Sequence, residues 1–322
     1  MPVEPSLTLL DNATLSQTDI NAGFEFRHYN DGKYDRQYII SDTVNSNLRA
    51  RDIAIEEAPK YQIPEKYAAY SRIMLEYQMS RSDKEAFENH RVCNLKSDLY
   101  PTTTSVKVSC AEYFDMLATY ESFPYNYRGE KGTIEFRGSN YLYNDYGVVF
   151  PISSNYAVNP IGANTLAITK DGKMIITRQG KDARTNSGKL MPSGSGVTSW
   201  HDYIDDEAVT TLQGIVIHGA NYKLRLECEI PKRFTLKTQV LGMARVPKGM
   251  KPDFYCLTEI DATLDELIEA GAKGQGYDVL EVGDAKPSEV LSAYIDERNE
   301  KRPGSVSIQL FLESWFLAET GR

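Results

Sequence analysis

The sequence predicts an α/β protein, with an α/β/α sandwich built on a mixed sheet in its second half. An α+β N-terminal region of unknown fold precedes it. Strand and helix patterns alternate from about residue 160 onwards, and an Asp-Gly turn joins two apolar runs. A long helical pattern follows a glycine-rich loop. Such alternation favours helices layered on a sheet. The 322 residues suffice for two domains, which we place at residues 1–139 and 140–322.

Composition indicates a soluble globular chain. Hydrophobic residues make up 41% and charged residues 25%, with a net charge of −9. Lysine and arginine are dispersed, which argues against a surface for duplex nucleic acid. No apolar run approaches the roughly 20 residues that a membrane helix needs, and the first residues lack the features of a secretory signal. We therefore expect a cytoplasmic protein that does not bind membranes.

The four cysteines lie far apart in the sequence and show no paired spacing. They are Cys93, Cys110, Cys228 and Cys256. Zinc sites and disulfide frameworks use closely spaced or regularly arranged cysteines. We therefore expect reduced, mostly buried thiols.

The N-terminal region predicts short elements between polar stretches. Residues 1–35 are weakly periodic and predict a partly ordered arm. Ser109 followed by Glu112 has the spacing of a capping box. The stretch 120–147, rich in Tyr, Asn and Gly, predicts the seam between domains. The predicted elements are strands at 37–40, 105–108 and 133–136, a helix from Pro64 to about Met79, and a helix from about 110 to Thr119.

The second half shows clearer signals. Lys170-Asp171-Gly172 separates two strand patterns, and Asp-Gly is a strong hairpin-turn signal. Thr263 with Glu266 has capping-box spacing for a short helix ending near Gly271. The other predicted elements are strands at 165–169, 173–177, 235–245, 254–258 and 277–282, and helices at 287–298 and 307–319.

Between the hairpin and the next strand lies the stretch that carries the functional hypothesis. Pro192-Ser193-Gly194-Ser195-Gly196 combines small residues that permit unusual backbone angles and let amides approach an anion. Most such loops are ordinary turns. A long helix then ends near Ile230, and its apolar residues recur at helical spacing, which predicts one core face. That predicted face consists of Leu212, Ile215, Val216, Gly219, Tyr222, Leu226 and Ile230.

The order of strand hairpin, glycine loop and helix ending in carboxylates resembles the Nudix hydrolase superfamily over about residues 160–285. The family motif runs Gly, five residues, Glu, seven residues, then Arg-Glu-apolar-any-Glu-Glu-any-Gly-apolar. Of its metal ligands only Glu227 survives, and an insertion lies around 201–212. The motif is therefore degenerate. The aligned residues are Gly214 and Leu226 at glutamates, Tyr222 at the arginine, Lys223 at the first glutamate of the cluster, Leu224 and Ile230 at apolar positions, and Glu229 at the glycine.

The resemblance implies hydrolysis of nucleoside diphosphates linked to another group, with Mg²⁺ or Mn²⁺. It assigns Glu227 as metal ligand and catalytic carboxylate, and places Glu259 where the family often has an extra base. The alternative is that Glu227 and Glu229 are solvated helix glutamates and that Glu259 is a loop carboxylate. The acidic run from Asp202 to Glu207 holds substitute ligands, or simply favours a helix N-terminus. The phosphate-binding candidates are Arg178, Lys189, Ser193, Gly194, Ser195, Gly196 and Arg245.

Three functions follow from these residues. The first is a nucleotide-binding protein that recognises a small nucleoside-diphosphate-type ligand and has lost or weakened hydrolysis. The second is an active Mg²⁺- or Mn²⁺-dependent hydrolase that uses substitute carboxylates. The third is a structural or interaction protein with a vestigial pocket and a protein partner at the N-terminal region. The losses from the motif favour binding over catalysis.

Overall fold

A nine-stranded mixed sheet forms the centre of the computed structural model. The strand order is β13-β12-β11-β16-β15-β4-β3, with β14 pairing β11 and β17 pairing β12. Strands β11 and β16 are parallel, whereas β11–β12 and β15–β16 are antiparallel. The strands are β3 (Glu25–Asn30), β4 (Asp35–Ile40), β11 (Gly162–Thr169), β12 (Lys173–Arg178), β13 (Leu190–Met191), β14 (Gly194–Val197), β15 (Leu236–Arg245), β16 (Pro252–Ile260) and β17 (Asp278–Glu281). The structure describes residues 3–5, 13–30, 35–80, 88–178, 190–204, 209–245, 248–272, 278–283 and 285–299.

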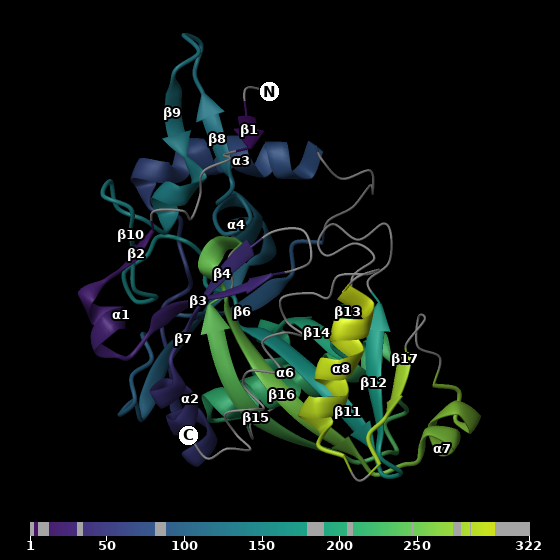
Figure 1. The fold of residues 1–322 in the computed structure, drawn as a ribbon. Coiled ribbons are helices and arrows are strands. Elements are labelled where there is room, and N and C mark those ends of the chain that lie inside the picture. The colour runs from purple at the N-terminus through teal and green to yellow at the C-terminus, as the bar shows by residue number, and fades with distance from the viewer. Residues whose placement is uncertain are drawn as a thin grey trace.

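Helices cover both faces of this sheet (Figure 1). On one face lie α6 (Leu212–Glu227) and α2 (Asp42–Ala50), whose apolar residues share a core cluster with Phe254 of β16. On the other lies α8 (Pro287–Asn299), which packs with Tyr255 of the same strand. Successive strand residues point to opposite faces, so the two clusters define two sides of one sheet. The predicted layered α/β fold with a mixed sheet is confirmed.

The N-terminal region contributes smaller sheets, with strand orders β5-β7-β6, β1-β8-β9 and β10-β2. It also supplies β3 and β4 to the edge of the large sheet, so one core cluster contains residues from Ala22 to Cys256. The division at residue 139 stays a prediction. The remaining elements are β1 (Val3–Pro5), β2 (Thr14–Leu15), α1 (Gln17–Asn21), β5 (Ala54–Glu57), η1 (Glu65–Tyr67), α3 (Ala68–Ser80), β6 (Arg91–Leu95), β7 (Ser105–Glu112), α4 (Tyr113–Ala118), β8 (Tyr125–Arg128), β9 (Ile134–Arg137), η2 (Gly138–Tyr141), β10 (Val148–Val149), α5 (Trp200–Ile204), η3 (Lys248–Met250) and α7 (Leu264–Glu269).

Local sequence signals are mostly confirmed. Gly172 has a φ of 75° in the β11–β12 turn, and Thr263 and Glu266 form the capping box of α7. The predicted arm contains α1 and β3 in its described part. The predicted helix at 307–319 lies outside the described residues.

One predicted cap was wrong. Ser109 lies inside β7, where its hydroxyl accepts a hydrogen bond from the Asn94 side chain of β6. Helix α4 instead begins after Glu112, which forms a capping box with Asp115. Pairing with β6 therefore extends the strand past a local helix signal.

Within the described residues, no helix has both the length and the hydrophobicity needed to span a bilayer. All four cysteines are reduced, and only Cys110 is partly exposed.

Candidate functional site

The glycine loop is largely a strand edge rather than an open turn. Ser193 is buried, and its hydroxyl accepts a hydrogen bond from the Ala167 amide (2.7 Å) and donates one to the Ile175 carbonyl (2.6 Å). Ala167 and Ile175 are partners on β11 and β12. The side chain therefore bridges these strands, next to the point where β14 replaces β12 beside β11. Ser193 has a structural role here, and its hydroxyl is already bonded on both sides.

The two loop glycines allow β14 to approach helix α6 closely. A Cβ atom on Gly194 would lie 2.4 Å from the backbone nitrogen of Leu224. A Cβ atom on Gly196 would lie 2.5 Å from Cε and 3.1 Å from Nζ of Lys223. Real Cβ contacts are not this short, so the packing of α6 on β14 requires glycine at position 194. At position 196 the glycine makes room for a lysine side chain.

Glu227 holds this contact together from the last turn of α6. Its Oε1 accepts a hydrogen bond from the Ser195 amide at 3.1 Å. Burial raises the pKa of Glu227 to about 7, although the Ser195 amide and the charge of Lys223 both lower it. A carboxyl group that keeps its proton near neutral pH is unusual. Here the cause is the loss of solvation where Glu227 packs against β14.

This raised pKa predicts how stability depends on pH. Between about pH 4.5 and pH 7 the folded state keeps the Glu227 proton while the unfolded chain loses it, so the free energy of unfolding falls as pH rises. Glu227→Gln keeps an acceptor for Ser195 and removes the titration. The substitution changes the free energy of unfolding at each pH. We expect this change to be about 1–2 kcal/mol more stabilising at pH 8 than at pH 4.5.

Urea unfolding at the two pH values measures this difference. Glu259→Gln is the control, because Glu259 is exposed on β16 and its ion pair in the described part of the chain is with the exposed Lys237. Equal effects of the two substitutions at both pH values would contradict the assigned role of Glu227.

The described residues do not fit a divalent metal at this position. No group of three or more His, Cys, Asp or Glu side chains among them could hold an ion. One oxygen of Glu227 already accepts from the Ser195 amide, and the charge of Lys223 lies nearby. Glu259 lies on the α8 side of the sheet, because its neighbour Thr258 bonds toward Thr238 and α6. Of the substitute carboxylates, 205–207 and the side chain of Asp202 lie outside the described residues.

The two arginines proposed for phosphate lie on opposite faces of the sheet. Arg178 ends β12 on the α8 side, where it pairs with Asp278 and donates to the Tyr294 hydroxyl at 3.4 Å. Arg245 ends β15 on the other side and is 1% exposed. Strands β11 and β16 separate them. The structure does not bring these side chains together.

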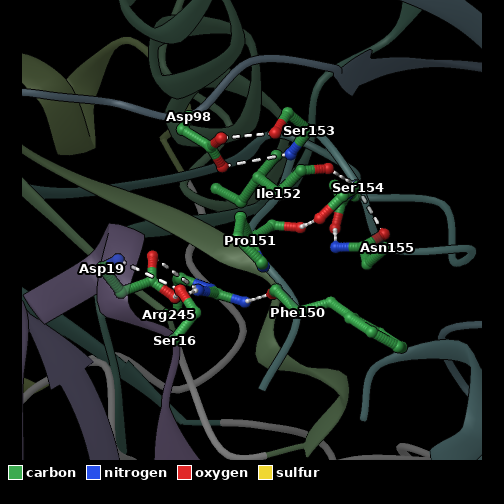
Figure 2. Close-up of polar contacts among 11 residues, drawn as sticks. Ser16, Asp19, Asp98, Phe150, Pro151, Ile152, Ser153, Ser154, Asn155 and Arg245 are labelled. Atoms are coloured by element: carbon green, nitrogen blue, oxygen red, sulfur yellow. Dashed lines mark hydrogen bonds and ion pairs between the residues drawn. The ribbon is translucent and has the colours of Figure 1, made fainter. Parts of the chain in front are cut away.

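Arg245 instead connects three segments of the chain, as Figure 2 shows. Its Nη1 lies 3.4 Å from a carboxylate oxygen of Asp19, and its Nη2 donates to the Phe150 carbonyl at 3.0 Å. Asp19 is itself fixed by the Ser16 hydroxyl. Both partners belong to this chain, so Arg245 has a structural role in the described contacts. Lys189, the third proposed cation, lies outside the described residues.

Comparison with known proteins gives structural neighbours only. No family model matches the sequence, and no curated protein matches it. The crystal structure of DR0079 from Deinococcus radiodurans is similar with a TM-score of 0.32 and 17% identity, over 53% of this chain and 95% of that one. The MutT protein from Methanosarcina mazei Go1 has a TM-score of 0.29 and 12% identity, over 51% and 96%. Each neighbour thus aligns over nearly its whole length with about half of this chain.

The exposed side of α6 differs from the sequence prediction. Tyr222 and Leu226, predicted as core, are 47% and 60% exposed. Ala220 and Leu224 are buried instead, because they continue the four-residue spacing from Val216. A count of both apolar series would have shown two competing faces on α6, without showing which of them is buried. Lys223, Tyr222 and Leu226 therefore form, with Glu227, a partly exposed face along the end of α6 that sequence reasoning did not single out; we call it the α6 face.

Proposed function

We propose that this Nudix-like chain binds a nucleoside-diphosphate-type ligand at the α6 face, without metal-dependent hydrolysis. The observation that carries the proposal is the position of the Lys223 ammonium, which lies over the backbone of Gly196 where any side chain would collide with the lysine. An ammonium beside a small-residue strand edge suits a phosphate group. The two come together through the close packing of α6 on β14.

Charge balance supports an anionic ligand over a cation. Lys223 carries a positive charge, while the raised pKa of Glu227 leaves much of that side chain neutral near pH 7. The pair is therefore more positive than a lysine and a glutamate in water. Mg²⁺ binds several anionic oxygens, and the neighbouring ammonium repels it.

Two exposed apolar side chains flank the charged pair and suit a base. Tyr222 lies beside Lys223, whose Nζ is 5.6 Å from the centre of the tyrosine ring. Leu226 follows one turn later on the same side of α6. Aromatic rings stack on nucleobases with energies of about 1–3 kcal/mol. A nucleotide with its base on Tyr222 and a phosphate at Lys223 would use both kinds of contact.

Thermal unfolding with ADP, UDP-glucose and inorganic pyrophosphate, each with Mg²⁺ and with chelator, tests the proposal. A ligand at 100 times its dissociation constant adds about 2.7 kcal/mol of stability. We expect stabilisation by at least one nucleotide that persists in chelator. Lys223→Met should abolish that shift, because it removes the ammonium and keeps the chain length.

Lys237→Met is the matched control, since Lys237 lies on β15 and pairs with Glu259. It should leave the shift unchanged. Stabilisation that requires Mg²⁺ and is lost in Glu227→Gln would favour the hydrolase instead. A flat response to every nucleotide, with the wild-type chain folded, would reject nucleotide binding and leave the interaction protein.

A further inference from the structure

Two of the four cysteines face each other across neighbouring strands. Cys93 of β6 is the direct register partner of Cys110 of β7 in an antiparallel pair. Directly opposite residues have side chains on the same face of a sheet. Both cysteines also belong to or pack against the same core cluster. Two reduced thiols, 17 positions apart in the sequence (110 − 93 = 17), therefore lie side by side.

The backbone hydrogen bonds identify the type of pair. The Cys93 amide donates to the Thr198 carbonyl at 3.1 Å, and the Cys93 carbonyl accepts from Ile161 at 3.0 Å. The Cys110 carbonyl accepts from Tyr61 at 2.8 Å. These groups point away from the partner strand. Cys93 and Cys110 thus form a non-hydrogen-bonded pair, the arrangement in which opposite side chains are closest.

This geometry meets the requirements of a disulfide. Opposite Cα atoms in a non-hydrogen-bonded pair are about 4.5 Å apart, and disulfides span Cα separations of about 4.4–6.8 Å. We propose that Cys93 and Cys110 are a modification site, at which hydrogen peroxide forms a reversible disulfide that loosens the segment following β14. Cys228 and Cys256 are the comparison, because both are buried and neither lies in that register.

The reaction balances with peroxide as the only oxidant. Cys110 is the partly exposed thiol, so its thiolate attacks one peroxide oxygen and becomes a sulfenic acid, with release of water after protonation. The Cys93 thiolate then attacks the Cys110 sulfur, forms the S–S bond and displaces a second water. Overall, two thiols and one peroxide give one disulfide and two waters. Burial raises the pKa of the Cys110 thiol, although Arg91 and Lys60 lower it, so the reaction needs excess peroxide.

The disulfide would act on the segment that follows β14, the strand whose Ser195 contacts Glu227 of the α6 face. In the reduced protein the Cys93 thiol donates to the Ser199 carbonyl at 3.4 Å, and Val92 forms a β-bridge with Ser199. Ser199 follows β14 and precedes α5. Bonding of the Cys93 sulfur to Cys110 removes the donor from Ser199. Oxidation therefore weakens the attachment of this segment to β6.

Peptide mapping of the full chain tests the pair directly. Reduced protein is treated with excess hydrogen peroxide, the remaining thiols are alkylated, and a non-reducing digest is analysed by mass spectrometry. We expect a linked peptide containing Cys93 and Cys110, lighter by two hydrogens and released by dithiothreitol. Cys256→Ala should give the same product, whereas Cys110→Ser should not. Alkylation of both thiols after treatment, or a bond from either to a second chain, would overturn the proposal.

Two further measurements test how the disulfide affects overall stability and the segment after β14. Oxidation should raise the melting temperature by roughly 5 °C through closure of the loop between the cysteines, with no such rise in Cys110→Ser. Amide hydrogen exchange at 199–203 should become faster in the oxidised protein. Unchanged exchange there would reject the link between the disulfide and the segment after β14. Neither readout uses a nucleotide, so their outcome is independent of the proposed function.

Discussion

Arg245→Met is expected to lower the free energy of unfolding by about 3–5 kcal/mol. The guanidinium is buried between α1 and the carbonyl of Phe150, and it faces the carboxylate of Asp19 (Figure 2). Burial already raises the pKa of Asp19 while Arg245 lowers it. Without the arginine, a buried carboxylate loses its counter-charge and a carbonyl loses its donor. Urea unfolding at pH 7 measures the loss.

Arg72→Met is the matched control. Arg72 lies on α3 with its side chain 83% exposed and pairs with Glu76 one turn away. Exposed pairs of this kind contribute about 0–1 kcal/mol, so the control should change stability little. The double variant Asp19→Asn, Arg245→Met should be less damaging than the sum of the single variants, because the two side chains interact. Strict additivity would show that the ion pair is not what holds α1 to β15.

Gly194→Ala is expected to cost about 3 kcal/mol of stability, at the upper end of the range for overpacking. The new Cβ would lie 2.4 Å from the Leu224 nitrogen and 2.7 Å from its Cα. These are backbone atoms of α6, so the clash is relieved only if the helix moves away from β14. Such a movement would also stretch the bond between Ser195 and Glu227. Thermal or urea unfolding of the purified variant gives the number.

Substitution of the neighbouring glycine, Gly196, is expected to weaken nucleotide binding with little loss of stability. In Gly196→Ala the Cβ meets Cε and Nζ of Lys223, the far end of a flexible side chain. We expect a loss under about 1 kcal/mol, because the lysine can swing aside, together with weaker nucleotide binding, because its ammonium leaves the strand edge. If the two glycine variants lost equal stability, the α6–β14 contact would not depend on the backbone approach at Gly194.

Local chemistry made part of this fold predictable. The Asp171-Gly172 turn and the Thr263–Glu266 cap depend on residues a few positions apart, and both formed as predicted. The predicted cap at Ser109 was wrong because the environment of this residue is set by β6, a separate strand that pairs with β7. The prediction that Tyr222 is buried was wrong for a similar reason. Two apolar series on α6 compete, and only the position of the sheet determines which one is buried.

The candidate site was less predictable, because it depends on which face of the sheet each residue occupies. Arg178 and Arg245 both end strands of the large sheet. A register shift between Val240 and Gly242 changes the alternation along β15 before Arg245 is reached. Period-two counting therefore cannot assign its face. The raised pKa of Glu227 likewise depends on burial against β14, which no spacing in the sequence expresses.

The pairing of β4 with β15 also determines when this protein can finish folding. Ile40 lies opposite Ala244, so the pair joins residues 204 positions apart (244 − 40 = 204). At ribosomal speeds of about 5–20 residues per second, the partner of β4 emerges roughly 10–40 s after β4 itself. During that interval the β3–β4 hairpin holds Ile39 and Ile40, which are buried in the finished fold, without their final cover. The nascent chain is thus most exposed to aggregation before its second half has been synthesised.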